Sequence, residues 1–199
     1  EETGLPKDLA LRLPKQMFEA GIPSIELTGG GEPMVYPYIS EFLDELGQYP
    51  IELAIVTNGA SLNENLQSKL NNLKWIRFSV DAITSETHSK VHRVPESVFG
   101  VVQKNISQVV ARKFEDCKVG ISFVITQHNH QEIEEAASFY KSLGVDSIRY
   151  TFTYDPEGEG ALSLDATRNA ERAMNNARRL QDENFKVFGT MRRLEFYSQ

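Results

Sequence analysis

Short runs of apolar residues alternate with longer amphipathic stretches along most of the chain. Five short runs have the length and the β-branched or aromatic content of strands, at residues 24–28, 52–57, 75–81, 119–126 and 147–154. Apolar residues at helical spacing predict helices between them, at 5–20, 35–47, 62–70, 99–112 and 131–143. A last helix at 165–182 and a possible sixth strand at 185–190 follow. This order predicts parallel strands joined by right-handed crossovers.

Several of the predicted strands alternate apolar with polar residues. In the third strand Arg77, Ser79 and Asp81 share one face, because successive side chains of a strand point to opposite sides. The first and fifth strands repeat the pattern with a second set of polar positions: Glu26, Thr28, Arg149, Thr151 and Thr153. A parallel sheet covered on both faces is usually apolar throughout, so one face of this sheet is expected to meet water.

A concave, partly open βα barrel accommodates such a polar face. The predicted fold class is α/β, a partial (β/α)6 TIM-like barrel with parallel strands, in one domain over residues 1–199. Its core is expected at 5–155, followed at 156–199 by a loop, a helix and an extra strand, with a mobile acidic stretch at 155–160. A doubly wound sheet and an antiparallel sheet with one solvent face remain alternatives.

Composition narrows the class of protein further. The chain has 199 residues, a net charge of -7 and a single cysteine, Cys117. Nucleic-acid binding needs clustered Lys and Arg, which this charge disfavours. No apolar run approaches the roughly 20 residues of a membrane helix, and the first residues are not a basic signal segment. A cytoplasmic protein without membrane or nucleic-acid partners is expected.

A glycine-rich motif follows the first predicted strand and carries the strongest chemical signal. It consists of consecutive residues at a strand-to-helix connection: Thr28, Gly29, Gly30, Gly31, Glu32 and Pro33. Ligands of βα folds collect at the carboxyl ends of strands, and glycines leave backbone groups accessible to them. Glu32 would supply a negative charge for an ammonium group. The alternative is a tight turn in which Glu32 complements the dipole of the next helix.

Short polar motifs end the next two predicted strands. Thr57-Asn58-Gly59 closes the second strand, and Ser79-Val80-Asp81 closes the third. Each motif alone is compatible with an ordinary turn or a helix cap. Together with the glycine motif they occupy three consecutive strand ends, which favours a single ligand site at one mouth of the barrel.

The series of motifs resembles the radical S-adenosylmethionine (SAM) enzymes. Gly29-Gly30-Gly31-Glu32-Pro33 is similar to the GGEP motif of that family, Thr57-Asn58-Gly59 to its TNG, and residues 77–82 to its strand bearing serine and aspartate. Residues 123–126, followed by Asn129 and Glu132-Ile133, resemble the following strand and helix start more loosely. The resemblance covers about 5–155 and implies SAM contacts from the following residues: Thr28, Gly29, Gly30, Gly31, Glu32, Pro33, Thr57, Asn58, Ser79, Asp81 and Thr126.

The resemblance also implies an iron-sulfur cofactor. Family members carry C-x3-C-x2-C after their first strand, and these thiolates hold a [4Fe-4S] cluster. That motif is absent here, so we expect the first strand and its cluster loop to be missing from this chain, which alone would be inactive. The longer enzyme would reductively cleave SAM to a 5'-deoxyadenosyl radical acting on an unknown substrate, with a flavodoxin or ferredoxin as reductant.

Histidines leave other functions open. His128 and His130 follow a predicted strand, and a metal-dependent barrel hydrolase or lyase would use them. His88 and His92 lie four residues apart on a probable helix, although solvated histidines are the simpler interpretation. A degenerate, non-catalytic barrel that serves as a binding module is the third alternative. Cys117 lies before a predicted strand, at the wrong end of the barrel for a cluster ligand.

Overall fold

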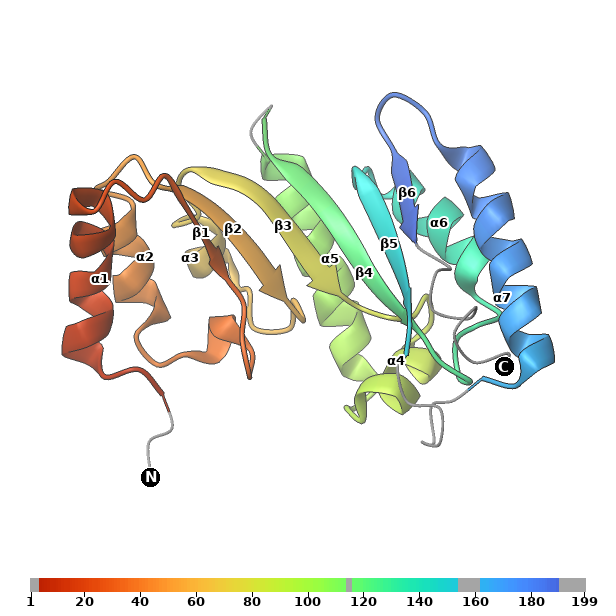
Figure 1. The fold of residues 1–199 in the computed structure, drawn as a ribbon. Helices are drawn as coiled ribbons and strands as arrows, with labels where there is room; N and C mark the ends of the chain where they lie inside the picture. The colour runs from red at the N-terminus through yellow and green to blue at the C-terminus, as the bar shows by residue number, and fades with distance from the viewer. Residues whose placement is uncertain (1–3, 114–115, 154–161, 190–199) are drawn as a thin grey trace, which may run out of the picture.

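The computed structural model describes residues 4–113, 116–153 and 162–189, and the stretch predicted as a mobile loop at 155–160 lies outside these ranges. Within them the strands form one six-stranded sheet in chain order, and every neighbouring pair is parallel (Figure 1). The strands are β1 (Ser24–Leu27), β2 (Glu52–Thr57), β3 (Leu73–Ser79), β4 (Lys118–Ile125), β5 (Ser147–Phe152) and β6 (Lys186–Gly189). All six predicted strands are confirmed, with ends that differ by a few residues.

Helices occupy the connections between the strands. They are α1 (Lys7–Glu19), η1 (Pro33–Val35), α2 (Ile39–Leu46), α3 (Glu64–Gln67), α4 (Ser85–His92), α5 (Ser97–Arg112), α6 (Ile133–Ser142), α7 (Leu164–Ala177) and η2 (Arg178–Leu180). The helix predicted at 35–47 begins only at Ile39, because Pro37 disfavours helical backbone in the residue before it. No helix in the described ranges is both long and apolar enough to cross a membrane.

The two faces of the sheet differ in burial as the alternation predicts. On β3 and β5 one set of side chains is almost completely buried beneath the helices: Ile76, Phe78, Ile148 and Tyr150. The alternate set is partly or fully exposed: Arg77, Ser79, Arg149 and Thr151. Each large apolar side chain that is fully buried contributes roughly 1.5–3 kcal/mol, so the covered face supplies most of the stabilisation of the fold.

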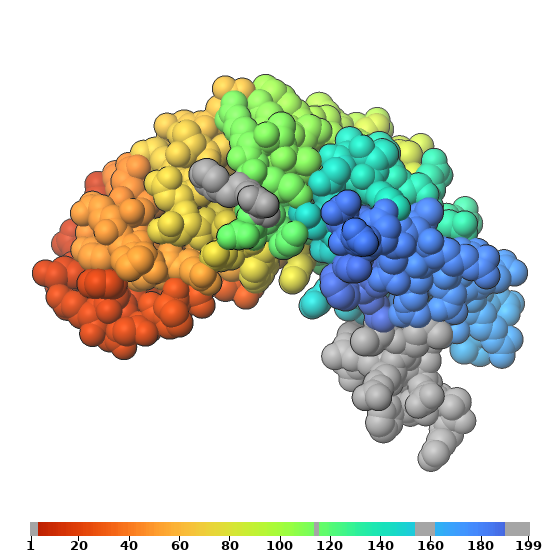
Figure 2. All heavy atoms as spheres, turned by 90° about the horizontal axis from the view of Figure 1, so that it is seen from above, coloured from red at the N-terminus to blue at the C-terminus, as the bar shows by residue number. Residues whose placement is uncertain are grey.

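The sheet curves into an open arc. Viewed from above, the molecule runs from its first helix to its last around a hollow, and the helices lie on the outside (Figure 2). β1 and β6 are the two edges of the described sheet and do not pair with each other. The partial barrel is therefore confirmed. The antiparallel alternative is wrong because every pairing is parallel, and the doubly wound alternative is wrong because the strand order never reverses.

Candidate cofactor site at the carboxyl ends of the strands

Glu32 ties the loop after β1 to the end of β2. Its Oε1 accepts hydrogen bonds from the Met34 N–H at 3.0 Å and the Thr57 hydroxyl at 2.6 Å, and its Oε2 accepts one from the Asn58 N–H at 2.6 Å. The bond from Met34 also caps η1, so the turn that the sequence offered as an alternative does form. No cation of the described ranges pairs with this carboxylate. Glu32 is thus held in place with its charge uncompensated.

The three glycines before Glu32 lie in open space. A Cβ added to Gly29, Gly30 or Gly31 would meet no atom within 4 Å, and none of the three has a positive φ. A left-handed backbone conformation is therefore not the reason for glycine at these three positions. Packing in the described ranges also does not explain why these three positions are glycine. Thr28, which precedes them, is exposed at the same edge.

The Thr57-Asn58-Gly59 motif combines a turn with a support for Glu32. The Thr57 hydroxyl donates to Glu32 and also accepts from the Gly59 N–H at 3.0 Å. The Asn58 side chain closes the turn by accepting from the Ala60 N–H at 2.9 Å. Gly59 has φ 77°, and a Cβ there would lie 2.7 Å from the Phe78 ring, so this glycine is required by the fold. The turn interpretation of this motif is correct, while the exposed Asn58 remains open to a ligand.

Ser79 and Asp81 do not share one environment. Ser79 ends β3 and is partly exposed on the concave face, as is Thr153 after β5. Asp81 is only 6% exposed and adopts a left-handed backbone with φ 58°, which interrupts the strand alternation. Its Oδ1 accepts from the Val124 N–H at 2.6 Å, extending the ladder between β3 and β4. The expectation that Asp81 faces the open cavity is therefore wrong.

Asn129, which the sequence indicated only as part of a loosely matching segment, is buried and joins the ends of β3 and β4. The Asn129 Nδ2 donates to the carbonyl oxygens of Asp81 and Val124, both at 2.8 Å, and its Oδ1 accepts from the Thr126 N–H at 2.7 Å. Asn129 is completely buried. Thr126, a predicted contact residue, is partly exposed beside it. A Thr-x-x-Asn spacing directly after a strand was the available signal.

Glu132 makes a second such connection. Its Oε2 accepts from the Ile83 N–H at 2.9 Å, and its Oε1 accepts from the hydroxyl of Thr87 on α4. The carboxyl ends of β1 and β2 are thus joined through Glu32, and those of β3 and β4 through Asp81, Asn129 and Glu132. These links are made by groups of the chain itself, so they hold the loops at this edge in a defined arrangement.

His88 and His92 are not solvated, contrary to expectation. The His92 Nε2 lies 3.3 Å from the Asp81 Oδ2 and 2.9 Å from the Val80 carbonyl oxygen, and its ring lies 4.6 Å from that of buried His88. Burial lowers the pKa of His92, but the hydrogen bond to Asp81, the charge of Asp81 and the hydrogen bond to the Val80 carbonyl oxygen together outweigh this effect, and the pKa is raised. Burial and the neighbouring His92 lower the pKa of His88 to about 4. These histidines attach α4 to the end of β3.

His128 and His130 do not form a metal site with the groups around them. His128 is exposed beside Gln127, and the His130 Nδ1 lies 3.2 Å from the Gln127 carbonyl oxygen. In the ranges that the structure describes, no three His, Cys, Asp or Glu side chains come together as metal ligands. The geometry therefore gives the metal-dependent alternative no support.

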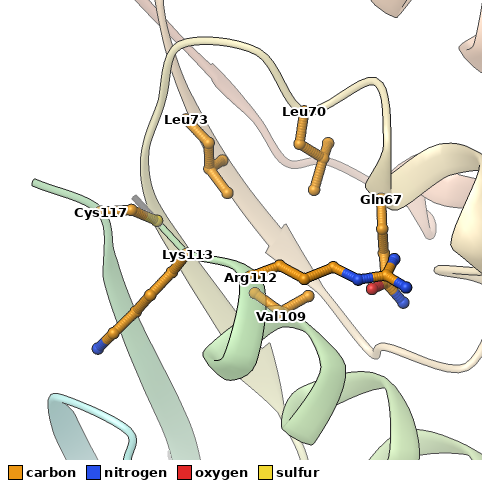
Figure 3. A pocket seen from close by; sticks show the side chains of 7 residues that line it. All are labelled: Gln67, Leu70, Leu73, Val109, Arg112, Lys113 and Cys117. Carbon is orange, nitrogen blue, oxygen red and sulfur yellow. The ribbon is translucent and has the colours of Figure 1, made fainter. Parts of the chain in front are cut away.

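Cys117 lies at the opposite end of the sheet. Together with Leu73, at the start of β3, it lines a hollow of about 50 Å³ near Arg112 and Lys113 (Figure 3). The thiol is buried, and burial raises its pKa, which disfavours the thiolate that a metal requires. The hollow has room for only a few water molecules. The expectation that Cys117 is a buried residue away from the ligand edge is confirmed.

Comparison with known proteins assigns the family. The Radical SAM superfamily matches residues 2–140, which is most of the chain. The chain therefore belongs to the radical SAM superfamily. The matched region contains the glycine motif and all the strand ends from β1 to β4 described above.

Two curated relatives are enzymes of different activity. The chain is 35% identical over 95 residues to the S-adenosylmethionine-dependent nucleotide dehydratase of Flammeovirga pacifica, covering 47% of this chain and 32% of that protein. It is 28% identical over 135 residues to the mycofactocin maturase MftC of Mycobacterium ulcerans, covering 67% of this chain and 35% of that protein. The chain thus spans about a third of the length of these relatives.

A solved structure shares the fold. SuiB of Streptococcus suis, crystallised with S-adenosylmethionine, superposes with a TM-score of 0.69 at 18% identity, over 96% of this chain and 44% of that one. Such a likeness supports the partial barrel architecture. It leaves the roles of individual residues to be argued from their own contacts.

Proposed function

We propose that this chain forms the SAM-binding part of a radical SAM enzyme. The observation that carries the proposal is the carboxylate of Glu32, which pairs with no cation of the described residues, beside three glycines that no described side chain covers. The methionine end of SAM bears an ammonium group, and a fixed carboxylate is a suitable partner for it. The open backbone of Gly29, Gly30 and Gly31 accommodates the same end of the molecule.

The other residues at this edge complete the proposed site. Thr57 holds Glu32 in position, and Thr28, Pro33, Asn58, Ser79 and Thr126 border the same mouth. We assign these residues as contacts or supports of SAM. Asp81, being buried and paired with His92, is a positioning residue that fixes α4 rather than a direct contact.

The proposal places the [4Fe-4S] cluster on residues outside these 199. A cluster of this family needs three thiolates, whereas the chain has one cysteine, buried at the far end of the sheet. When bound, the cluster supplies the electron that cleaves SAM to the 5'-deoxyadenosyl radical. The part played by this chain is to bind and orient SAM and to limit access of water to it. A flavodoxin or ferredoxin is the proposed reductant.

Titration of SAM into the wild-type chain and into Glu32→Gln tests the proposal. Glutamine retains an acceptor for Thr57 and Met34 but removes the charge. A hydrogen bond to a charged group contributes about 1.5–3 kcal/mol, so we expect SAM affinity to fall about 10- to 150-fold. Calorimetry or ligand-observed NMR measures the change.

Glu183→Gln is the matched control, because Glu183 is an exposed glutamate next to β6 that makes no hydrogen bond or ion pair in the described ranges. It should bind SAM as the wild type does. Unchanged affinity in Glu32→Gln, with a lowered melting temperature, would assign Glu32 to loop stabilisation alone. Absence of SAM binding in the wild type and in a longer, cluster-bearing protein would favour a non-catalytic binding module.

A further inference from the structure

Two arginines lie on the concave face, apart from the residues assigned to SAM. Arg77 is on β3 and Arg149 is on β5, with β4 between them. The register pairs Arg77 with Gly120 and pairs Ser122 with both Ser79 and Arg149, which puts all these positions on one face. Neighbouring strands are about 4.8 Å apart, so the two backbones are separated by roughly 10 Å across β4 and the long side chains can converge.

The strand between the arginines leaves them room. Gly120 has no side chain, and an added Cβ there would lie 2.9 Å from the Ser147 hydroxyl. At the level of Arg77, β4 therefore presents only backbone to the concave side. Ser122, one alternation further along, is small and polar. At these two positions β4 therefore carries no bulky side chain between the two arginines.

Neither guanidinium is neutralised by the described parts of the chain. No ion pair or hydrogen bond joins Arg77 or Arg149 to a carboxylate there. Partial burial and the charge of Arg149 lower the pKa of Arg77, and the charge of Glu26, the smallest of the three effects, acts in the opposite direction. The two arginines thus repel each other, although the protein has a net charge of -7 and therefore many carboxylates that could pair with arginine.

Aromatic surface accompanies the charges. The Arg77 guanidinium lies over the Trp75 ring, 4.9 Å from its centroid. Phe188 on β6 pairs in register with Arg149 and is 49% exposed. A large exposed aromatic residue on a concave polar face is suited to the apolar part of a ligand. Stacking on Trp75 also fixes the plane of the Arg77 fork for bidentate hydrogen bonds.

We propose that Arg77 and Arg149 form an oxyanion-binding site that holds a carboxylate or phosphate group of the substrate. The geometry that supports this is the pairing of two unneutralised guanidinium groups across a strand without bulky side chains. An oxyanion accepts hydrogen bonds from both forks and relieves their repulsion. Taking the ligand to be the substrate rests on the proposed function of the neighbouring SAM site.

The position within the sheet separates this site from SAM. Arg77 lies two residues before Ser79, or roughly 7 Å deeper than the carboxyl edge of β3. Arg149 is level with Ser79 in the register but lies two strands away from it, roughly 10 Å across the sheet. A substrate anchored here by its anionic end would direct another part of the molecule toward the edge where SAM is proposed to bind.

Anion titrations of the chain test the inference. Arginine side-chain Nε–Hε signals would be followed by NMR while inorganic pyrophosphate is added in one arm and succinate in the other. We expect saturable shifts of the Arg77 and Arg149 signals in at least one arm, and the stronger arm identifies phosphate or carboxylate. Arg77→Gln and Arg149→Gln should each weaken that binding at least tenfold, and the corresponding Lys variants should weaken it less.

Arg172→Gln is the control, since Arg172 lies on α7 and contacts only Asn169 among the residues described. It should leave anion affinity unchanged. Absence of saturable shifts in both arms, or equal effects of Arg172→Gln, would overturn the inference. A tenfold loss of SAM affinity in the Arg77 and Arg149 variants would also overturn it, by assigning the pair to the SAM carboxylate. Loss of SAM binding in Glu32→Gln tests the proposed function separately, because that variant leaves both arginines intact.

Discussion

The two ends of the sheet use buried or half-buried carboxylates in different ways. At the amino end, the Asp146 Oδ2 accepts hydrogen bonds from the Val119 N–H at 2.7 Å and from the Lys113 ammonium at 2.6 Å. At the carboxyl end, Glu32 accepts three hydrogen bonds from neutral groups and no cation of the described ranges pairs with it. The charge of Asp146 is compensated by the Lys113 ammonium group, whereas the charge of Glu32 remains available to a cationic group of a ligand.

The difference separates residues that hold the fold together from residues available to a ligand. The amino end is closed by Asp146 and by apolar side chains around Cys117, with a hollow of about 50 Å³. The carboxyl end combines rigid cross-links with an unfilled glycine loop. In a βα barrel the amino end serves stability and the carboxyl end serves binding, and the proposed function follows the same division.

The largest expected effect concerns the cluster. After reconstitution with iron and sulfide, the 199-residue chain should hold no stoichiometric [4Fe-4S] cluster, because Cys117 offers one buried thiol at the amino end. A longer protein that carries the cysteine triplet should hold a full cluster, and Cys117→Ser should leave it unchanged. Iron and sulfide analysis with visible absorption measures both. A full cluster on the short chain would contradict the assignment of Cys117 and the amino end to the stability of the fold.

The next effect concerns the cross-link between β3 and β4. Asn129→Ala leaves two carbonyl oxygens and one N–H without their partner in a completely buried position, so we expect a loss of about 3 kcal/mol in unfolding free energy and weaker SAM binding. Asp146→Asn, at the other end, retains an acceptor and should lose only about 1 kcal/mol. Denaturant titration and SAM titration of both variants test this. Weaker SAM binding in Asp146→Asn would contradict the assignment of the amino end to stability and of the carboxyl end to binding.

A smaller effect concerns pH. The pKa of His88 is lowered to about 4, so between its unfolded value near 6.5 and pH 4 the unfolded chain binds the proton more readily. Stability should therefore fall as pH falls through this window, by about 2 kcal/mol at pH 5. The raised pKa of His92 opposes the effect, since its contribution is greatest below pH 6.5. His88→Phe should flatten the profile in denaturant titrations at pH 7 and pH 5. An equally steep profile in this variant would exclude His88 as the cause.

Most of the fold could be predicted because it depends on periodicity. The alternation along β3 determines which side chains meet the helices, and Ile76 and Phe78 are completely buried as expected. The strand order also followed from the repeated strand and helix pattern. Element ends were less predictable, because they depend on local contacts such as the helix start delayed by Pro37.

The candidate site was predictable only where short motifs carry the chemistry. The Glu32 motif indicated an exposed loop with a carboxylate, and both are present. Asp81 was predicted to face the wrong side because its positive φ interrupts the strand alternation. A polar residue at a strand end does not by itself indicate a positive φ. Asn129 and Glu132 belong to the loosely matching segment after the fourth strand, but their contacts were not predicted because their partners, among them Asp81 and Ile83, are more than 40 residues away in the sequence.

The charge of Glu32 can be tested with a change in the ligand as well as in the protein. The affinities of SAM and of its analogue without the α-amino group would be measured by ligand-observed NMR on the wild-type chain and on Glu32→Gln. If Glu32 binds the ammonium group, losing that group should weaken binding at least tenfold in the wild type and less than about twofold in the variant. Equal weakening in both proteins would contradict the account.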